Sequence, residues 1–238
     1  MYRNNSLQWA ELDITRQGEP FSARFEDRYY SRHGALKESE YVFLEQNGLP
    51  GSWVNRAAFA IGEVGFGTGL NFLTVLKHWR KTKSEGAMLR FVSIEKYPLL
   101  PVDFKKLSKF DESGFMSLMN PFLRKYEEIQ AGWNYLCFPD EHVILELFIG
   151  DAFEGLQSKR FKVDAWFYDG FAPDKNPELW NDDMFKEIAL HSQKGTTIST
   201  FTAAGFVRRG LQRHGFQMEK VKGFGPKRDM IRGVWMGI

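Results

Sequence analysis

The stretch AFAIGEVGFGTGLNFLTVL, residues 58–76, decides the fold of this 238-residue chain. Its first residues, up to Glu63, form an apolar run typical of a buried strand, and its last residues repeat apolar side chains at helical spacing. Between them lie Gly65, Gly67 and Gly69. Glycines let the backbone turn sharply, and a helix that starts there directs its free N–H groups at a ligand. The stretch therefore predicts the strand, turn and helix that open a βαβ unit, with a ligand at the turn.

The same alternation continues outward, because apolar runs and helical patterns follow one another through residues 57–200. Such alternation is typical of βαβ units and a mostly parallel sheet. Near the end, two strands without a helix between them predict an antiparallel edge hairpin. The predicted strands are 58–63, 90–95, 142–149, 164–168, 196–200, 217–222 and 230–235, and the predicted helices are 70–80, 177–191 and 204–214. We therefore expect an α/β fold with an antiparallel C-terminal hairpin.

The remaining segments are interpreted as additions to this core. Residues 1–56 are expected to form an N-terminal extension packed on it, with two short strands followed by a loop and a short helix. Residues 57–238 form the domain itself, with a helical insertion at about 97–140. The predicted elements are strands 7–14 and 20–25, loop 26–34, and helices 36–44, 101–110 and 113–130.

Composition excludes several classes of protein. Apolar residues make up 43% of the chain, enough for a core, and a net charge of +2 is too small to indicate a nucleic-acid partner by itself. Cys137 is the single cysteine, which fits a reducing compartment. The chain has no signal peptide at its start and no apolar run near the ~20 residues of a membrane span. The histidines lack metal-ligand spacing. We expect a soluble, cytoplasmic protein without a metal.

The spacing of the glycines discriminates between cofactors. A dinucleotide site requires G-x-G-x-x-G, but Leu70 stands where its third glycine would be. The pattern from Glu63 to Gly69 instead resembles the first motif of S-adenosylmethionine enzymes, E/D-x-G-x-G-x-G. A plain strand-to-helix turn is the alternative interpretation, and Leu70 disfavours a nicotinamide oxidoreductase.

Two further acids follow predicted strands. Glu95 ends the strand RFVSIE and could accept hydrogen bonds from both hydroxyls of a ribose. Asp151 follows the next strand, where methyltransferases commonly hold the adenine amine; alternatively it caps the helix that starts near Glu154. Because open α/β sheets bind ligands along one edge, acids at successive strand tips are more specific than any one of them.

Asp169, in VDAWFYDGFAPDKNPELW, ends the fourth parallel strand and is the candidate general base. A primary amine is mostly protonated at neutral pH, so a carboxylate near the nitrogen could orient the ammonium and remove its proton. The alternative is an aspartate that stabilises a turn with Gly170.

These motifs resemble one family over nearly the whole chain. EVGFGTGLNFL, IEKYPL, VDAWFYDGFAPDKNPELW, TFTAAGFVRRGLQRHGF and KGFGPKRDM are similar to the methyltransferase module of MnmC-type tRNA-modifying proteins, as are EDRYYS and YVFLEQNGL. The resemblance implies a Rossmann-like Class I methyltransferase fold. It also implies methylation of 5-aminomethyl-2-thiouridine at the tRNA wobble position to 5-methylaminomethyl-2-thiouridine, with S-adenosyl-L-methionine as donor.

The resemblance also implies roles for residues. Asp169 corresponds to the catalytic aspartate and Glu95 to the ribose-binding acid. The full set of expected cofactor-binding residues is Glu63, Gly65, Gly67, Gly69, Asn71, Glu95, Lys96, Asp151, Ala152 and Phe171.

Two features depart from the family. Many members continue into an FAD-dependent oxidoreductase module that prepares the amine, whereas this chain stops at Ile238. It is therefore expected to be a stand-alone or excised methyltransferase with such a module as partner. Pro226 stands where a basic residue is more usual, which leaves the RNA contacts of that loop open.

The expected RNA partner is the anticodon loop. From Gly205 to the end the chain has eight basic and two acidic residues, a distribution that could follow phosphates or simply form a solvated face. The residues expected to bind RNA are Arg208, Arg209, Lys227 and Arg228. A wobble base must be splayed out to be methylated. The aromatic candidates for its pocket are Tyr29, Tyr30, Phe66, Phe171 and Trp180, each of which could instead belong to the core.

Two other functions remain open at this point. One is a transferase of the same cofactor type that acts on a small-molecule amine. The other is a non-catalytic RNA-binding module that has kept the fold.

Overall fold

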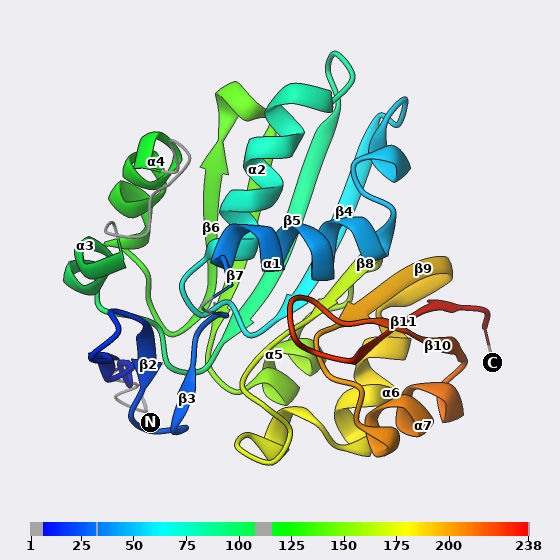
Figure 1. The fold of residues 1–238 in the computed structure, drawn as a ribbon. Helices are drawn as coiled ribbons and strands as arrows, with labels where there is room; N and C mark the ends of the chain where they lie inside the picture. Colours follow the sequence, from blue (N-terminus) through cyan, green and yellow to red (C-terminus); the bar gives the residue numbers. More distant parts are fainter. Residues whose placement is uncertain (1–6, 32, 108–115, 238) are drawn as a thin grey trace, which may run out of the picture.

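Parallel strands form the centre of the molecule, as the alternating pattern predicted. The computed structural model describes residues 7–31, 33–107 and 116–237, and within them an eight-stranded sheet has the order β10-β11-β9-β8-β4-β5-β7-β6 (Figure 1). Its five parallel strands are β4 (Ala58–Val64), β5 (Met88–Glu95), β7 (Val143–Ile149), β8 (Val163–Tyr168) and β9 (Ser192–Thr200). Because β5 lies on one side of β4 and β8 on the other, β4 and β8 flank the switch point where such sheets bind ligands.

The two edges of the sheet are antiparallel. The predicted C-terminal hairpin is confirmed: β11 (Asp229–Trp235) pairs with both β9 and the outermost strand, β10 (Phe216–Lys222). At the other edge β6 (Gly132–Phe138) pairs with β7, although we predicted only helices there. In β6 Leu136 and Phe138 are buried whereas Tyr135 and Cys137 are exposed, a period-two pattern that the neighbouring helical patterns masked.

Helices cover both faces of the large sheet (Figure 1). One face carries α1 (Ala35–Ser39), which continues as a π-helical turn (Glu40–Leu44), together with α2 (Leu70–Thr82) and α4 (Met116–Tyr126). The other face carries α5 (Ala152–Ser158), α6 (Asp182–Leu190) and α7 (Gly205–Arg213). Strand β8 serves both cores, because Phe167 packs on one face and Trp166 and Tyr168 on the other.

The N-terminal residues form a separate small sheet of β1 (Leu12–Ile14), β2 (Pro20–Ser22) and β3 (Asp27–Arg28). Both predicted strands are thus shorter than expected, and β3 lies inside the predicted loop 26–34. The predicted helix 177–191 divides into a 3-10 turn (Pro177–Leu179) and α6. The predicted helix 101–110 is a 3-10 turn (Pro101–Asp103) followed by α3 (Phe104–Leu107), and its last residues, with the first of 113–130, lie outside the described residues.

Among the described residues, further 3-10 turns are Glu45–Asn47, Gly51–Trp53 and Pro139–Glu141. In the part of the chain that the structure describes, no helix has the length and apolar character needed to cross a membrane.

Candidate active site

The glycine turn brings the ends of β4 and β8 into contact. Gly65 has φ +87°, which few other residues adopt, and a Cβ there would lie 2.9 Å from the Cα of Gly170. The N–H groups of Gly65 and Phe66 both donate to the carbonyl oxygen of Ile94 at the end of β5. The turn is therefore tied to both neighbouring strands, and only glycine allows this approach.

Glu95 at the tip of β5 organises the same turn. Its Oε2 accepts the N–H of Gly67 at 2.7 Å and its Oε1 accepts the N–H of Tyr97 at 2.8 Å. Burial raises the pKa of Glu95, and these backbone donors counteract the shift. A carboxylate can accept about four hydrogen bonds in all, so Glu95 keeps accepting capacity for a ligand hydroxyl.

Asp151 at the tip of β7 caps a helix and lies on the wall of a cavity. Its side chain caps α5 by accepting the N–H groups of Phe153 at 3.0 Å and Glu154 at 3.4 Å, which confirms the N-cap interpretation. Its Oδ2 lies 3.2 Å from Nζ of Lys96, and Asp151 also lines a cavity of about 1050 Å³ at the strand tips, called the main cavity below. One side chain thus serves the helix and the cavity wall.

Asp169 at the tip of β8 is held by a buried hydrogen-bond network. Its Oδ1 accepts the N–H of Gly170 at 2.8 Å, and its Oδ2 accepts a hydrogen bond from Asn71 Nδ2 at 2.8 Å. Asn71 Nδ2 also donates to Glu63 at 3.0 Å, and Asn71 Oδ1 accepts from the hydroxyl of Ser39 at 2.6 Å. The orientation of the Asn71 amide is therefore fixed, and it presents its nitrogen to Asp169.

The protonation of this network follows from its burial. Burial raises the pKa of Asp169 to about 7, although the hydrogen bonds from Gly170 and Asn71 lower it. Glu63 is 1% exposed, and burial raises its pKa well above the usual range. Asp169 is consequently a carboxyl group that exchanges its proton near neutral pH, as a general acid or base requires.

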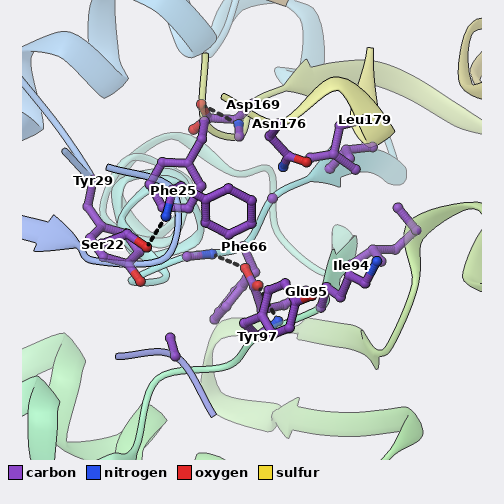
Figure 2. A pocket seen from close by; sticks show the side chains of 18 of the residues that line it. Ser22, Phe25, Tyr29, Phe66, Ile94, Glu95, Tyr97, Asp169, Asn176 and Leu179 are labelled. Carbon is purple, nitrogen blue, oxygen red and sulfur yellow. Dashed lines mark hydrogen bonds between the residues drawn. The ribbon is translucent and has the colours of Figure 1, made fainter. Parts of the chain in front are cut away.

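A cavity of about 1050 Å³, including its open mouth, lies at these strand tips. Figure 2 shows Asp169 on one side of it and Glu95 with Tyr97 on the other. Nine of the predicted catalytic and cofactor residues line it: Gly65, Gly67, Asn71, Glu95, Lys96, Asp151, Ala152, Asp169 and Phe171. The other two predicted residues, Glu63 and Gly69, do not line it. Glu63 lies beneath the wall and accepts hydrogen bonds from Ser93 and Asn71, and a Cβ on Gly69 would face the ring of Phe66.

A second cavity of about 880 Å³ adjoins the first and shares Tyr29, Tyr30, Asn71 and Asp169 with it. Of the other aromatic candidates for a base pocket, Phe66 and Phe171 line the first cavity. Trp180 lines none of the described cavities and instead stacks on Tyr168 in the core at 4.6 Å between ring centres.

Sequence reasoning missed the wall that the N-terminal sheet supplies. Phe25 stacks on Phe171 at 4.5 Å between ring centres, and the guanidinium of Arg24 lies 4.2 Å from the centre of the Tyr97 ring. Both Phe25 and Arg24 line the main cavity (Figure 2 labels Phe25). No spacing rule links residues 24–25 to the strand tips, so only the tertiary structure identifies them.

The predicted RNA-binding residues separate into two places. Lys227 lines the second cavity, and Arg228, whose side chain is 94% exposed, lies on a shallow groove beside Phe206. Arg208 and Arg209 lie on α7 and line none of the described cavities. Several basic residues of this end pair with acids, namely Arg213 with Asp182, Lys220 with Asp229, Lys227 with Glu38 and Arg232 with Glu219.

The sequence of this chain is similar to a known protein family and to several named proteins. Residues 113–236 match a family model described as S-adenosyl-L-methionine-dependent methyltransferase. The chain is 43% identical over 237 residues to the tRNA 5-methylaminomethyl-2-thiouridine biosynthesis bifunctional protein MnmC of Pseudomonas paraeruginosa, covering 98% of this chain and 36% of that protein. For the protein of the same name from Methylobacillus flagellatus the identity is 44% over 231 residues, with 96% and 34% covered. The chain thus spans about a third of the length of these curated relatives.

The fold is shared with a solved structure. The crystal structure of MNMC2 from Aquifex aeolicus superposes with a TM-score of 0.75 at 24% identity, covering 99% of this chain and 73% of that one. The predicted α/β methyltransferase fold is thereby confirmed.

Proposed function

The chain belongs to the S-adenosyl-L-methionine-dependent methyltransferase family, and on that premise we propose that it methylates the primary amine of 5-aminomethyl-2-thiouridine at the tRNA wobble position. The product would be 5-methylaminomethyl-2-thiouridine, the nucleoside that appears in the names of the MnmC relatives. The observation that carries the proposal is Asp169, a half-buried carboxyl group that lines both cavities and whose pKa is raised to about 7 by desolvation.

The main cavity fits the cofactor. The Glu95 carboxylate suits the ribose hydroxyls, and Asp151 at the next strand tip suits the adenine amine. The glycine turn, which lines the same cavity, would lie beside the methionine part of the cofactor. When bound there, the cofactor supplies a methyl group on a positively charged sulfur. The expected cofactor residues Glu63 and Gly69 would act by shaping the wall.

The chain's own contribution to the reaction is at Asp169. A substrate ammonium in the second cavity would donate a hydrogen bond to a carboxylate oxygen of Asp169 and transfer one proton to it. The freed nitrogen lone pair then forms the new N–CH₃ bond as the S–CH₃ bond breaks, and Asp169 returns its proton to water. Asn71 and the N–H of Gly170 hold the carboxylate in one orientation throughout, which reduces the entropic cost of the attack.

The proposal also covers the RNA contacts, a partner module and the cellular location. Arg208, Arg209, Lys227 and Arg228 would contact the RNA, with the exposed Arg228 as the most accessible phosphate contact. The relatives are named bifunctional, which supports an FAD-dependent oxidoreductase module that supplies the aminomethyl group. A cytoplasmic location agrees with the single, exposed cysteine.

The function is tested by nucleoside analysis. The protein is incubated with methyl-labelled S-adenosylmethionine and tRNA that carries 5-aminomethyl-2-thiouridine, and in parallel with free polyamines. We expect label only in 5-methylaminomethyl-2-thiouridine. Label in the polyamines instead would favour the small-molecule transferase, and RNA binding without any methyl transfer would favour the non-catalytic module.

The pH dependence follows from the state of Asp169. Only the unprotonated carboxylate accepts a proton, and burial raises its pKa to about 7, so activity is present above that pH and lost below it. We expect kcat/KM to fall about tenfold per pH unit below the pKa. A profile that stays flat down to about pH 5.5 would contradict a base role for this carboxyl group.

A further inference from the structure

The second cavity contains a charged pair that the proposed reaction does not use. Glu38 comes from α1 and Lys227 from the loop between β10 and β11, and Glu38 Oε1 lies 3.2 Å from Lys227 Nζ. The Glu38 side chain is only 12% exposed, and its Oε2 accepts the N–H of Ser31 at 2.8 Å. Lys227 is 43% exposed, and its Nζ lies 4.8 Å from the centre of the Phe201 ring. A largely buried carboxylate thus obtains its countercharge from a lysine side chain that is partly exposed to solvent.

The lining of the same cavity offers aromatic side chains on which a pyrimidine could stack. Tyr30, Phe43 and Phe201 supply aromatic faces in its lining, and Asp169 forms part of the wall shared with the cofactor cavity. Beyond the effect of burial, the charge of Glu38 raises the pKa of Asp169 and that of Lys227 lowers it. Glu38, Lys227 and Asp169 therefore line one cavity and interact with one another electrostatically.

We propose that Glu38 recognises the cationic arm of the substrate and that Lys227 occupies this anionic position until the substrate arrives. This rests on the proposed function, in which a pyrimidine with an alkylammonium arm enters the second cavity. An arriving ammonium replaces the ammonium of Lys227 on Glu38, and Lys227 becomes free to contact an RNA phosphate.

The exchange would give specificity through electrostatics. A buried charge without a partner is costly, so Glu38 releases Lys227 only when another cation arrives to replace it. A neutral arm cannot replace Lys227, and an anionic arm would be repelled by both Glu38 and Asp169. The site therefore selects against wrong substrates as well as for the right one.

The test is a ratio of affinities. Binding is measured for two anticodon stem–loops that differ only in the wobble base, 5-aminomethyluridine or its neutral isostere 5-hydroxymethyluridine. We expect Glu38→Gln to lower the preference for the cationic stem–loop about tenfold, because the variant loses the charged hydrogen bond between the ammonium and Glu38. Lys227→Met should raise the preference several-fold, because no internal cation then competes for Glu38. Contacts to phosphate cancel in the ratio.

Matched controls separate this role from a structural one. Glu40→Gln removes an acid that pairs with Lys77 and His78 outside the described cavities, and Lys81→Met removes an exposed lysine of α2; both should leave the ratio unchanged. If the pair only holds the fold together, Glu38→Gln and Lys227→Met will weaken the binding of both stem–loops by the same factor. The ratio of the two affinities will then stay unchanged, and that result overturns the inference. A wild-type protein that binds the cofactor but leaves aminomethyl-tRNA unlabelled overturns the proposed function and this inference together, whereas methylation with an unchanged ratio overturns this inference alone.

Discussion

Asp169→Ala should lower kcat for methyl transfer by about 10²–10⁴-fold, the usual contribution of a positioned acid or base, while S-adenosylhomocysteine binds with nearly unchanged affinity. The reason is the separation seen in Figure 2, where Asp169 and Glu95 lie on opposite sides of the main cavity. Loss of the carboxylate removes the proton acceptor, but it leaves the ribose site, the glycine turn and Asp151 in place. Single-turnover methylation of tRNA and calorimetry with S-adenosylhomocysteine measure the two effects independently.

Two companion variants sharpen this prediction. Asp169→Asn keeps the size of the side chain and can still accept from Gly170, yet it cannot take a proton, so it should be nearly as inactive as Asp169→Ala. Asp183→Ala removes an exposed aspartate from the first turn of α6 and should keep full activity. An Asp169→Asn variant with wild-type kcat would show that the carboxylate positions the amine without accepting its proton.

The strand-tip acids could be predicted from the sequence because of one geometric rule. Carboxyl ends of parallel strands meet at a single edge of the sheet, so Glu95, Asp151 and Asp169 had to converge once their strands were recognised. The glycine spacing identified the turn between them for the same reason. Local pattern was sufficient here because each residue lies at the end of its own strand or within two residues of it.

The substrate side of the site could not be predicted in this way. Phe25 and Glu38 come from the N-terminal segment, whose position over the strand tips is set by tertiary packing alone. Lys227 was expected to bind phosphate because it belongs to a basic end of the chain. The structure pairs it with Glu38, 189 residues away in sequence, and counting charges along a sequence cannot detect such a pair.

The position of a residue in a motif also does not show whether its side chain contacts the ligand or another side chain. Glu63 begins the glycine motif and was expected to bind the cofactor, but it lies beneath the cavity wall and accepts a hydrogen bond from Asn71. Asn71 in turn donates to Asp169. The motif's first acid thus supports the candidate base through one intervening amide, a connection that depends on side-chain directions rather than on spacing.

Glu95→Ala should weaken binding of S-adenosylhomocysteine by about tenfold to a hundredfold or more, because hydrogen bonds to a charged acceptor contribute about 1.5–3 kcal/mol each. The loss has two sources. The ribose hydroxyls lose their acceptor, and the N–H groups of Gly67 and Tyr97 lose theirs, so the turn that shapes the cavity is no longer held. Calorimetric titration of the purified variant with S-adenosylhomocysteine measures the effect.

The order of a short variant series tests this explanation. Glu95→Gln keeps one carbonyl oxygen for a backbone N–H but places an NH₂ group where the second acceptor was, so its affinity should fall between those of the wild type and Glu95→Ala. Glu154→Gln, an exposed residue of α5 outside the described cavities, should bind as the wild type does. Affinity of Glu95→Ala within about threefold of wild type would mean that the carboxylate serves only the turn, since a lost charged hydrogen bond alone exceeds that factor. The ribose would then have to be held by a group other than the acid at the tip of β5.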